Sequence, residues 1–458
     1  MAPANAHCSP TLALFTLLTD TISHHIPKTM AKTRPQQART VKRKKHQARH
    51  HQLLATRTAL SQIQALIDTA RLAFDTADLP HALSLAEKAH RLSTAATINA
   101  DDDATPDPEL QACVLAATVL CAELQLELGD ALAARSLVDA AIALDPDGAM
   151  PEACGGGAEK FLHAGQLSGE GGRHSLALYE TALGILRSRL EAYGSEPEEH
   201  ERKDGHASRY AAACCAVAEL YMTDLSWEAD AEARCEAALE DALRVAPQSV
   251  EALQGRASMR ISQERVEEAC EALRESMSLW KDIRPDESAY PAFPVRVSLL
   301  RLLGEVGMLR EAGEVGGELL QEDDSSVEVM YLTGWVAYLK GERLRGGGEE
   351  DTDENKDVIK RWKRCWRESR GWFQDCLTVA AQQEYEDERL MEHAAELIGL
   401  IDEELGPEDE ELGPEDEADP DGQTEDPWDD EEEDEDDEED DTEHAHDGTA
   451  NNVEMTDA

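Results

Sequence analysis

Histidine pairs and glycine triplets are the residues of this sequence whose spacing first suggests chemistry. The histidines group as His24-His25, His50-His51 and His444-Ala445-His446. Each group lies in a sequence segment that we expect to lack a rigid framework. Side chains in such a segment bind divalent ions weakly and without selectivity. The triplets at 155–157 and 346–348 lack the Lys-Ser/Thr that follows a phosphate-binding loop. We therefore expect no catalytic residue, no metal and no cofactor, and we do not expect an enzyme.

Ten cysteines are present, and none of them forms a Cys-x-x-Cys pair. Most lie in segments rich in alanine and leucine, such as the one that holds Cys113 and Cys121. We interpret them as small buried hydrophobic residues of a protein in a reducing compartment, and not as a disulfide or zinc framework.

Charge is concentrated at the two ends of the chain. Residues 401–458 contain 31 Asp or Glu and no Lys or Arg, whereas residues 21–67 contain ten Lys or Arg and no acid. Blocks of like charge are typical of interaction tails. We expect residues 1–59 to be a disordered basic head and residues 405–458 a disordered acidic tail.

The formal net charge of -54 limits the classes of partner. It argues against direct nucleic-acid binding as the main activity, because that activity needs a basic footprint, which is here confined to the head. A surplus of negative charge attracts basic proteins by long-range steering. A tail that only keeps the protein soluble is the alternative.

The one apolar run near the start covers residues 12–18. It is too short to span a bilayer and no basic segment precedes it, so we expect neither a transmembrane helix nor a signal peptide, and no membrane partner. The basic head has a natural start at Met30. We expect residues 1–29 to be an extension added by the gene model.

Small residues recur with a period of about 34 between Leu60 and Glu404, the length of a two-helix repeat. The clearest copy covers residues 115–148, with Ala122 in its first helix, Gly129-Asp130 at the turn, and Ala134 and Ala141 in its second helix. A larger side chain at these alanines would force the two helices apart. Further copies start at residues 63, 156, 216, 250, 293 and 326.

The repeat predicts an all-α fold over residues 60–404, a tetratricopeptide-repeat superhelical solenoid of about seven helix pairs. An amphipathic helix over residues 384–404 is expected to cap the last pair, since solenoids need a closing element. We predict loops at 100–108 and 191–203, and an acidic, glycine-rich insert at 341–357 within the seventh pair.

The first helices of such repeats line a concave wall. In this register the wall presents mostly carboxylates, which would bind Arg- and Lys-rich cargo through charge-assisted hydrogen bonds. For any one of these residues, a merely solvated helix face is the alternative. The predicted groove residues are Asp75, Glu123, Glu127, Glu219, Asp224, Glu251, Glu305 and Tyr338.

Two longer segments carry a family resemblance. They read Glu159-Lys160-Phe161-Leu162-His163-Ala164-Gly165-Gln166-Leu167-Ser168-Gly169-Glu170-Gly171-Gly172 and Ala218-Glu219-Leu220-Tyr221-Met222-Thr223-Asp224-Leu225-Ser226-Trp227-Glu228. With the basic start after Met30 and the acidic tail, they resemble the fungal family of dedicated assembly chaperones of large-subunit ribosomal protein four.

The resemblance implies a function. The groove would hold the long internal loop of that basic ribosomal protein, keep the protein soluble and escort it to the nucleus for large-subunit assembly. The complex would be one-to-one with a monomeric chaperone. The resemblance transfers no binding residue individually, so the groove residues above follow from repeat geometry alone.

Two other classes of repeat protein remain as alternatives. A histone chaperone with tetratricopeptide repeats and an acidic tail would also take basic cargo. A co-chaperone that binds the carboxylate tails of Hsp70 or Hsp90 would need Lys and Asn on successive first helices, where this sequence has mainly acids and neutral residues.

The cluster Lys42-Arg43-Lys44-Lys45 is typical of a nuclear localisation signal read by an importin. The alternatives are a patch that touches the ribosome or RNA, or simply a solvated helix start. With the rest of the chain so acidic, we favour nuclear import and expect a protein that shuttles between nucleus and cytoplasm.

Replacing all four residues of this cluster by alanine should move a fluorescent fusion of the chain from nucleus to cytoplasm, because importin recognition depends on their positive charge. The same replacement at four lysines or arginines outside the cluster should leave the fusion in place. A four-alanine variant that stays nuclear would show that another signal, such as one on the cargo, directs import.

Overall fold

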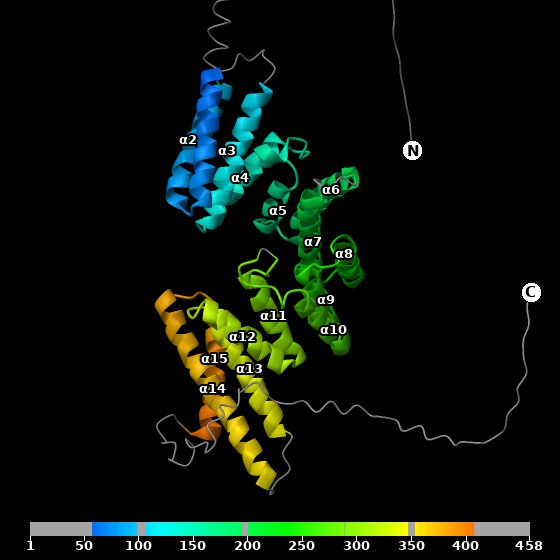
Figure 1. Cartoon of the computed structure of the whole chain (residues 1–458), viewed down its shortest axis with the longest axis vertical. Helices are drawn as coiled ribbons and strands as arrows, with labels where there is room; N and C mark the ends of the chain where they lie inside the picture. The colour runs from blue at the N-terminus through cyan, green and yellow to red at the C-terminus, as the bar shows by residue number, and fades with distance from the viewer. Residues whose placement is uncertain (1–56, 99–106, 195–199, 288, 347–352, 407–458) are drawn as a thin grey trace, which may run out of the picture. The chain divides into compact units, whose positions relative to one another are not determined.

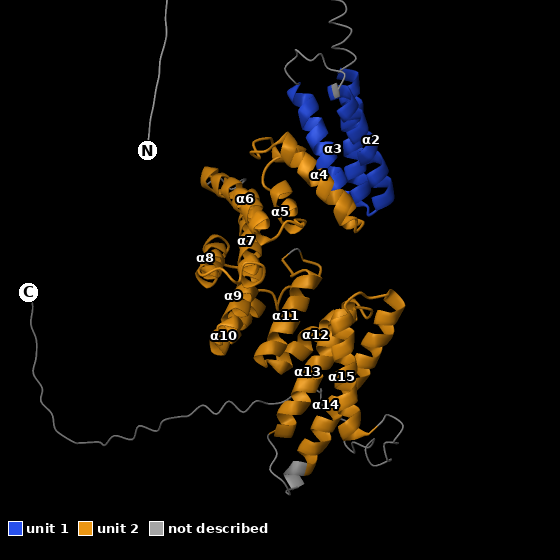
Figure 2. Cartoon of the chain, turned by 180° about the vertical axis from the view of Figure 1, so that it is seen from behind, with its two compact units in different colours: residues 1–124 blue, residues 125–458 orange. Residues whose placement is uncertain are grey.

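The computed structural model describes residues 57–98, 107–194, 200–287, 289–346 and 353–406, and they are helical with no strand among them (Figure 1). The chain divides into two compact units, residues 1–124 and 125–458 (Figure 2). The predicted localisation cluster at 42–45, the three histidine groups and the acidic tail beyond Gly406 lie outside the described residues.

Taken in chain order, the described helices make seven pairs and one closing helix. The first pair is a helix over residues 57–75 with α2 (Leu79–Ile98), and a single 3-10 turn, η1 (Glu152–Cys154), precedes the third pair. The later pairs are α3 (Pro108–Glu127) with α4 (Ala131–Leu144), α5 (Glu159–Gln166) with α6 (Gly172–Ala192), α7 (His200–Met222) with α8 (Ala231–Val245), α9 (Val250–Ser262) with α10 (Val266–Ser278), α11 (Phe293–Val306) with α12 (Leu309–Glu322), and α13 (Val327–Gly346) with α14 (Asp353–Gln383), before α15 (Glu388–Leu405).

The small residues that define the period are buried where helices cross. Ala122 is 2% exposed, and Ala134 and Ala141 are fully buried. The equivalent small residues of the other pairs are fully buried as well: Ala70, Ala82, Ala89, Ala182, Ala242, Ala257, Ala269, Ser276 and Ala312. The predicted all-α class, the tetratricopeptide-type pairing and the closing helix are confirmed.

The predicted insert at 341–357 is wrong in its extent. Helix α13 continues to Gly346 and α14 already begins at Asp353. Gly341 lies within helix α13, and Trp366 of α14 packs directly against it. A Cβ at position 341 would lie 2.3 Å from the indole Cδ1. The glycine that suggested a loop is there for close packing between helices. The loop predicted at 191–203 is also shorter, since α7 begins at His200.

Several pairs share one turn geometry between their two helices. After α9, the Glu264 N–H donates to the Ile261 carbonyl and the Arg265 N–H to the Arg260 carbonyl, both at 2.9 Å. This is a Schellman motif, which requires one residue in the left-handed region. Glu264 occupies it with φ 59°, as does Gly129 of the second pair with φ 80°. Ala77 and Gly307 occupy the same region in the first and sixth pairs.

The residue after this turn begins the second helix. Asp130 caps α4 by accepting a hydrogen bond from the Ala133 N–H at 2.9 Å, and Asp78 accepts one from the His81 N–H at 3.3 Å. An N-terminal cap of this kind satisfies a backbone donor that the helix leaves unpaired. The Gly-Asp and Ala-Asp dipeptides of the repeat thus end one helix and start the next.

Helix α3 is long and predominantly apolar. By length and composition it could cross a membrane, but 61% of that apolar window is buried inside the protein, and residues 113–122 are buried without interruption. Burial on all sides is what a core helix needs, and it explains the continuous apolar run.

The predicted burial of the cysteines is confirmed for most of those described. Six of the nine are buried: Cys113, Cys121, Cys214, Cys235, Cys365 and Cys376. Burial raises the pKa of the Cys121 and Cys214 thiols to about 12. Such thiols stay protonated at neutral pH and are poor nucleophiles.

Replacing Glu264 by glycine should stabilise the protein by about 0.5–1 kcal/mol, because glycine adopts the left-handed conformation without the steric cost that a Cβ adds. The side chain is exposed, so no packing is lost. The midpoint of urea unfolding should rise for Glu264→Gly and stay unchanged for Glu264→Ala, which keeps the Cβ. Equal midpoints for glycine and alanine variants would mean that this turn carries no strain.

Candidate functional site

The predicted groove residues lie mainly at the surface. Glu219 on α7, Glu251 on α9 and Glu305 on α11 are exposed, each on the first helix of its pair. Asp224 is exposed in the loop after α7, and Tyr338 on α13 is half-buried. Of the remaining residues, Asp75 and Glu127 are exposed and Glu123 is half-buried.

Tyr338 differs from the expectation of an open wall. Its ring stacks on Trp366 of α14, with centroids 5.2 Å apart and ring planes 8° from parallel. It packs there beside Trp362 and Ile401 of the neighbouring helices. This tyrosine joins the last helix pair to the closing helix, and stacking on Trp366 covers one face of its ring.

Glu219 and Glu251 come together across two consecutive first helices. Helices α7 and α9 pack against one another, and the Cys215 thiol lies near both carboxylates. Burial raises the pKa of Cys215 to about 12, and the negative charges of Glu251 and Glu219 add to the shift. Glu219 also lies near Tyr179 of α6, where its charge reinforces the effect of burial in raising the pKa of that phenol. The two acids therefore share one patch.

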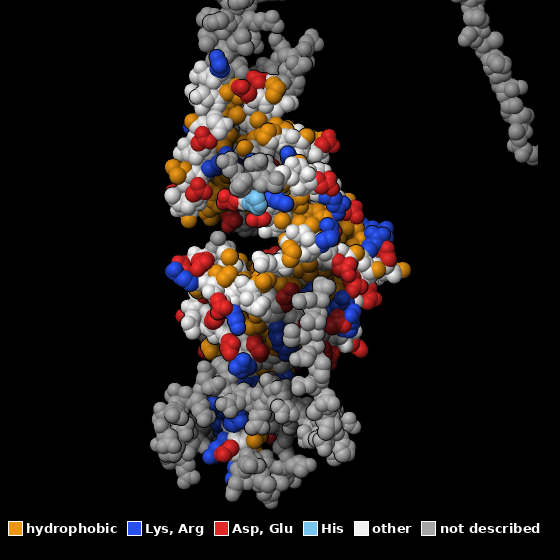
Figure 3. Space-filling view, turned by 45° about the vertical axis from the view of Figure 1, so that its right-hand side comes forward, with side chains coloured by type: hydrophobic (Ala, Val, Ile, Leu, Met, Phe, Trp, Pro, Cys, Tyr) orange, Lys and Arg blue, Asp and Glu red, His pale blue; other side chains and the backbone are white. Residues whose placement is uncertain are grey.

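Four of the predicted groove acids have no basic partner among the described residues. No described Lys, Arg or His lies within ion-pair distance of the carboxylates of Glu127, Glu219, Glu251 or Glu305. Other surface acids do have such partners, as Glu236 does with Arg260 at 2.8 Å. On the face shown in Figure 3, acidic and basic side chains are interleaved. The unpaired acids therefore stand out by their lack of partners, not by a uniform field.

Asp224 belongs to a second surface feature, which contains an exposed tryptophan. Trp227 is 69% exposed, and its indole N–H donates to the Asp224 carbonyl at 2.9 Å. The Arg173 guanidinium lies over the indole, 5.2 Å from the ring centroid, and forms an ion pair with Glu228 at 2.9 Å. The indole is thus held in place with most of its surface open.

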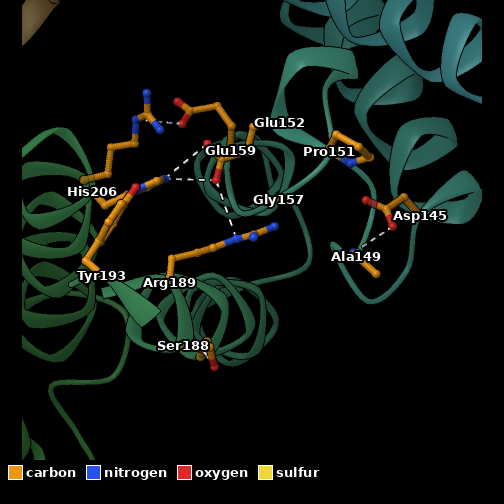
Figure 4. Close-up of polar contacts among 12 residues, drawn as sticks. Asp145, Ala149, Pro151, Glu152, Gly157, Glu159, Ser188, Arg189, Tyr193 and His206 are labelled. Atoms are coloured by element: carbon orange, nitrogen blue, oxygen red, sulfur yellow. Dashed lines mark hydrogen bonds and ion pairs between the residues drawn. The ribbon is translucent and has the colours of Figure 1, made fainter. Parts of the chain in front are cut away.

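A buried histidine network is the nearest approach to catalytic chemistry in the described residues. His206 Nε2 lies 2.9 Å from a Glu152 carboxylate oxygen, and His206 Nδ1 lies 2.6 Å from the Tyr193 hydroxyl (Figure 4). In the neutral ring, Nε2–H donates to Glu152 and Nδ1 accepts from Tyr193. The imidazole is only 6% exposed, so no substrate reaches it. The network fastens η1 to α6 and α7, and no group of three potential metal ligands occurs among the described residues.

Comparison with known proteins decides the family. No protein-family model matches the chain. A curated protein of Emericella nidulans, named probable assembly chaperone of rpl4, is 37% identical over 342 residues, which are 74% of this chain and 82% of the relative. A protein of the same name from Schizosaccharomyces pombe is 32% identical over 284 residues, 62% of this chain and 79% of the relative. This chain belongs to the family of assembly chaperones of rpl4.

A solved structure agrees with this assignment. It is described as Assembly Chaperone of RpL4 (Acl4), residues 1–338, and it aligns with a TM-score of 0.54 at 41% identity, over 62% of this chain and 98% of that one. The resemblance to the chaperone family that the sequence suggested is confirmed.

The two segments that carry the family resemblance meet in space. A Cβ at Gly172 would lie 2.6 Å from the Asp224 Cβ, and Arg173 contacts Trp227 and Glu228. Gly165 is equally constrained, because a Cβ there would lie 2.7 Å from the Tyr179 ring. Gly165 and Gly172 are therefore required by packing, and Gly172 contacts the second segment of this chaperone directly.

A buried ion pair anchors the start of the first segment. The Lys160 ammonium lies 2.8 Å from an Asp145 carboxylate oxygen, with side-chain exposures of 0% and 4%. Lys160 also donates to the Gly157 carbonyl at 2.9 Å, and Asp145 accepts the N–H of Ala149 at 2.9 Å (Figure 4). These bonds hold the chain between α4 and α5, from which the segment begins.

The sequence analysis missed a row of basic residues on α14. Lys356, Lys360, Lys363 and Arg367 follow helical spacing of four, three and four, so they lie along one face. Arg364 is exposed beside them. The helical spacing of these basic residues is present in the sequence, but the predicted insert at 341–357 includes the first of them. In a chaperone with a net charge of -54 this face is an exception.

Replacing Lys160 by methionine should destabilise this chaperone by about 3–5 kcal/mol, because the buried Asp145 carboxylate loses its counter-charge. The double variant Lys160→Met/Asp145→Asn should lose less than the sum of the two single variants, since neither charge is left alone. Urea unfolding of the four proteins measures this coupling.

The exposed pair Arg91–Glu87, 3.0 Å apart, is the matched control. Arg91→Met should cost less than about 0.5 kcal/mol, as for other exposed ion pairs. Additive effects at positions 160 and 145 would show that the buried pair is not coupled.

Proposed function

We propose that this chain is a dedicated chaperone of the basic large-subunit ribosomal protein rpl4, which it binds through acids on its first helices. The family assignment supports the cargo, since its members are named for the assembly of rpl4. The single observation that supports the binding surface is the unneutralised pair Glu219 and Glu251 on adjacent helices.

The energetics of exposed charge shape this proposal. An exposed ion pair contributes only about 0.2–1 kcal/mol, so two carboxylates alone cannot retain a cargo. Several such pairs together set the approach rate and the orientation of a basic partner. Because Glu219 and Glu251 project from packed helices, little ordering is needed when the cargo binds.

An apolar contact must accompany these charges, and Trp227 is our candidate for it. Its indole is 69% exposed, although most tryptophans are buried. Aromatic faces attract Arg and Lys through cation–π contacts, and Arg173 already occupies one such contact. We infer that Trp227 stacks on a basic or apolar side chain of the cargo.

We further infer that the chaperone is not an enzyme. Its most reactive arrangement centres on His206, which is buried, and the contacts of His206 with Glu152 and Tyr193 serve packing. Holding and releasing a cargo requires no bond making, and the chaperone names of the relatives agree with such a role.

The remaining parts of the proposal concern partners and location. We infer a monomer that binds one cargo molecule, an importin that binds Lys42–Lys45, and shuttling between cytoplasm and nucleus.

The Hsp70/Hsp90 alternative is disfavoured because Glu219 and Glu251 occupy first-helix positions where a carboxylate clamp would need cations. A histone chaperone stays an alternative, since histones are also basic.

Reversing both charges, Glu219→Lys with Glu251→Lys, should weaken rpl4 binding by about 10–100-fold, because repulsion replaces attraction at two adjacent positions. The control Glu267→Lys/Glu271→Lys makes the same charge change at exposed residues of the second helix α10. It should bind within about threefold of the unchanged protein, since rim charges act mainly on the association rate. Binding of purified rpl4 by calorimetry, with helicity checked by circular dichroism, measures both.

Histones H3–H4 serve as the competing cargo in the same assay. Equal loss of rpl4 binding in the α10 control would mean that net charge, and not this patch, determines affinity. An unchanged chain that binds histones more tightly than rpl4 would favour the histone-chaperone alternative.

A further inference from the structure

Four basic residues lie close together along helix α14. Lys360 and Arg364 are exposed, and Lys363 and Arg367 are half-buried. Among the described residues, no carboxylate lies within ion-pair distance of any of these four side chains. We call these four residues the basic stripe.

The stripe is held by rigid surroundings. Lys363 lies over the Trp362 ring at 5.6 Å, and Arg345 lies over Trp362 and Trp366 at 5.4 Å and 5.2 Å. Both indoles are buried, at 7% and 2% exposure. Helix α14 therefore keeps the backbone positions of these cations on one face, where like charges repel. A polyanion would relieve this repulsion.

The described chain ends beside the stripe. The Arg370 guanidinium donates to the Gly406 carbonyl at 3.0 Å and to the Asp402 carboxylate at 2.9 Å. Arg345 forms an ion pair with Glu404 at 3.2 Å. Helices α14 and α15 pack side by side (Figure 1). Arg370 is one helical turn from Arg367, so Gly406, the last described residue, lies near the end of the stripe.

That segment has the opposite charge. Residues 407–458 contain 28 Asp or Glu and no Lys or Arg, and residues 429–441 are all acidic. The acidic run begins 23 residues after Gly406. A chain of that length spans at most about 80 Å, whereas Lys360 and Arg367 are about 10 Å apart along the helix axis. The run can therefore reach every residue of the stripe.

We propose that the acidic run 429–441 docks on the basic stripe of α14 within the same chain. Tethering raises the effective concentration of the run at the stripe to the millimolar range, so weak ion pairs suffice. The contact would be salt-sensitive because both partners lie at the surface. This docking contact does not depend on the proposed function. Competition between the stripe and basic cargo for the acidic run does rest on the proposed function.

Zero-length cross-linking by carbodiimide tests the contact, because it joins only lysines and carboxylates that touch. In the full-length chain at about 50 mM salt, Lys360 and Lys363 should be joined to peptides from 429–441. The yield should be independent of protein concentration, as expected within one chain, and should fall at about 500 mM salt.

The variant Arg364→Glu/Arg367→Glu leaves both lysines in place and should lower this yield by about tenfold, because two repulsions replace two attractions. The control Arg274→Glu/Arg310→Glu makes the same charge change at exposed arginines of α10 and α12 and should leave the yield unchanged. Changing the acids of 429–441 to Asn and Gln should abolish the cross-links without altering a folded residue.

Absence of these cross-links in the unchanged protein would overturn the proposal, as would equal yields in the stripe variant and its control. Binding of a fluorescent oligouridine to the full-length chain that Arg364→Glu/Arg367→Glu abolishes would also overturn it, since the stripe would then be open to RNA. No oligouridine binding until the acidic run is neutralised would support it.

Discussion

Close contact between the two helices of each pair is the constraint on which the rest of this structure depends. It requires a small residue at each crossing, and Ala134, Ala141, Ala182 and Ala242 are accordingly buried. With the helix spacing fixed, successive first helices present equivalent positions to one side. That is why Glu219 and Glu251, 32 residues apart in sequence, share one patch around Cys215.

The chaperone separates its charges in a way that composition alone conceals. Four acids on first helices, Glu127, Glu219, Glu251 and Glu305, have no ion-pair partner among the described residues, and the same holds for Lys360, Lys363, Arg364 and Arg367 on the second helix of the last pair. Where the two signs meet inside the protein they are fully desolvated and specific, as in Lys160–Asp145. The exposed charges are available to bind partners, whereas the buried ion pair holds the chain between α4 and α5 in place.

The helix pairs and their turns could be predicted from sequence because both depend on local requirements: small residues at crossings and a left-handed residue at the turn. The insert was misplaced because a glycine such as Gly341 can indicate either a loop or close packing between helices. Only the position of Trp366 shows that close packing is the reason here. Tyr338 was placed on an open wall since its stacking partner comes from another helix. The network of His206 joins residues up to 54 positions apart, which no periodic pattern reveals. The docking of the two family segments on each other also depends on such distant contacts.

The contacts between helices have a consequence for how the protein comes apart. In the second unit each helix packs only on its immediate neighbours and on the next helix but one. Cooperativity in such an array decays along the chain, because losing an end costs one interface and leaves the others intact. The α14–α15 end can therefore open locally while α7–α10 stays folded, and amide hydrogen exchange would be fastest at the ends. A protein built this way can lose its helix contacts stepwise from the ends, without global unfolding.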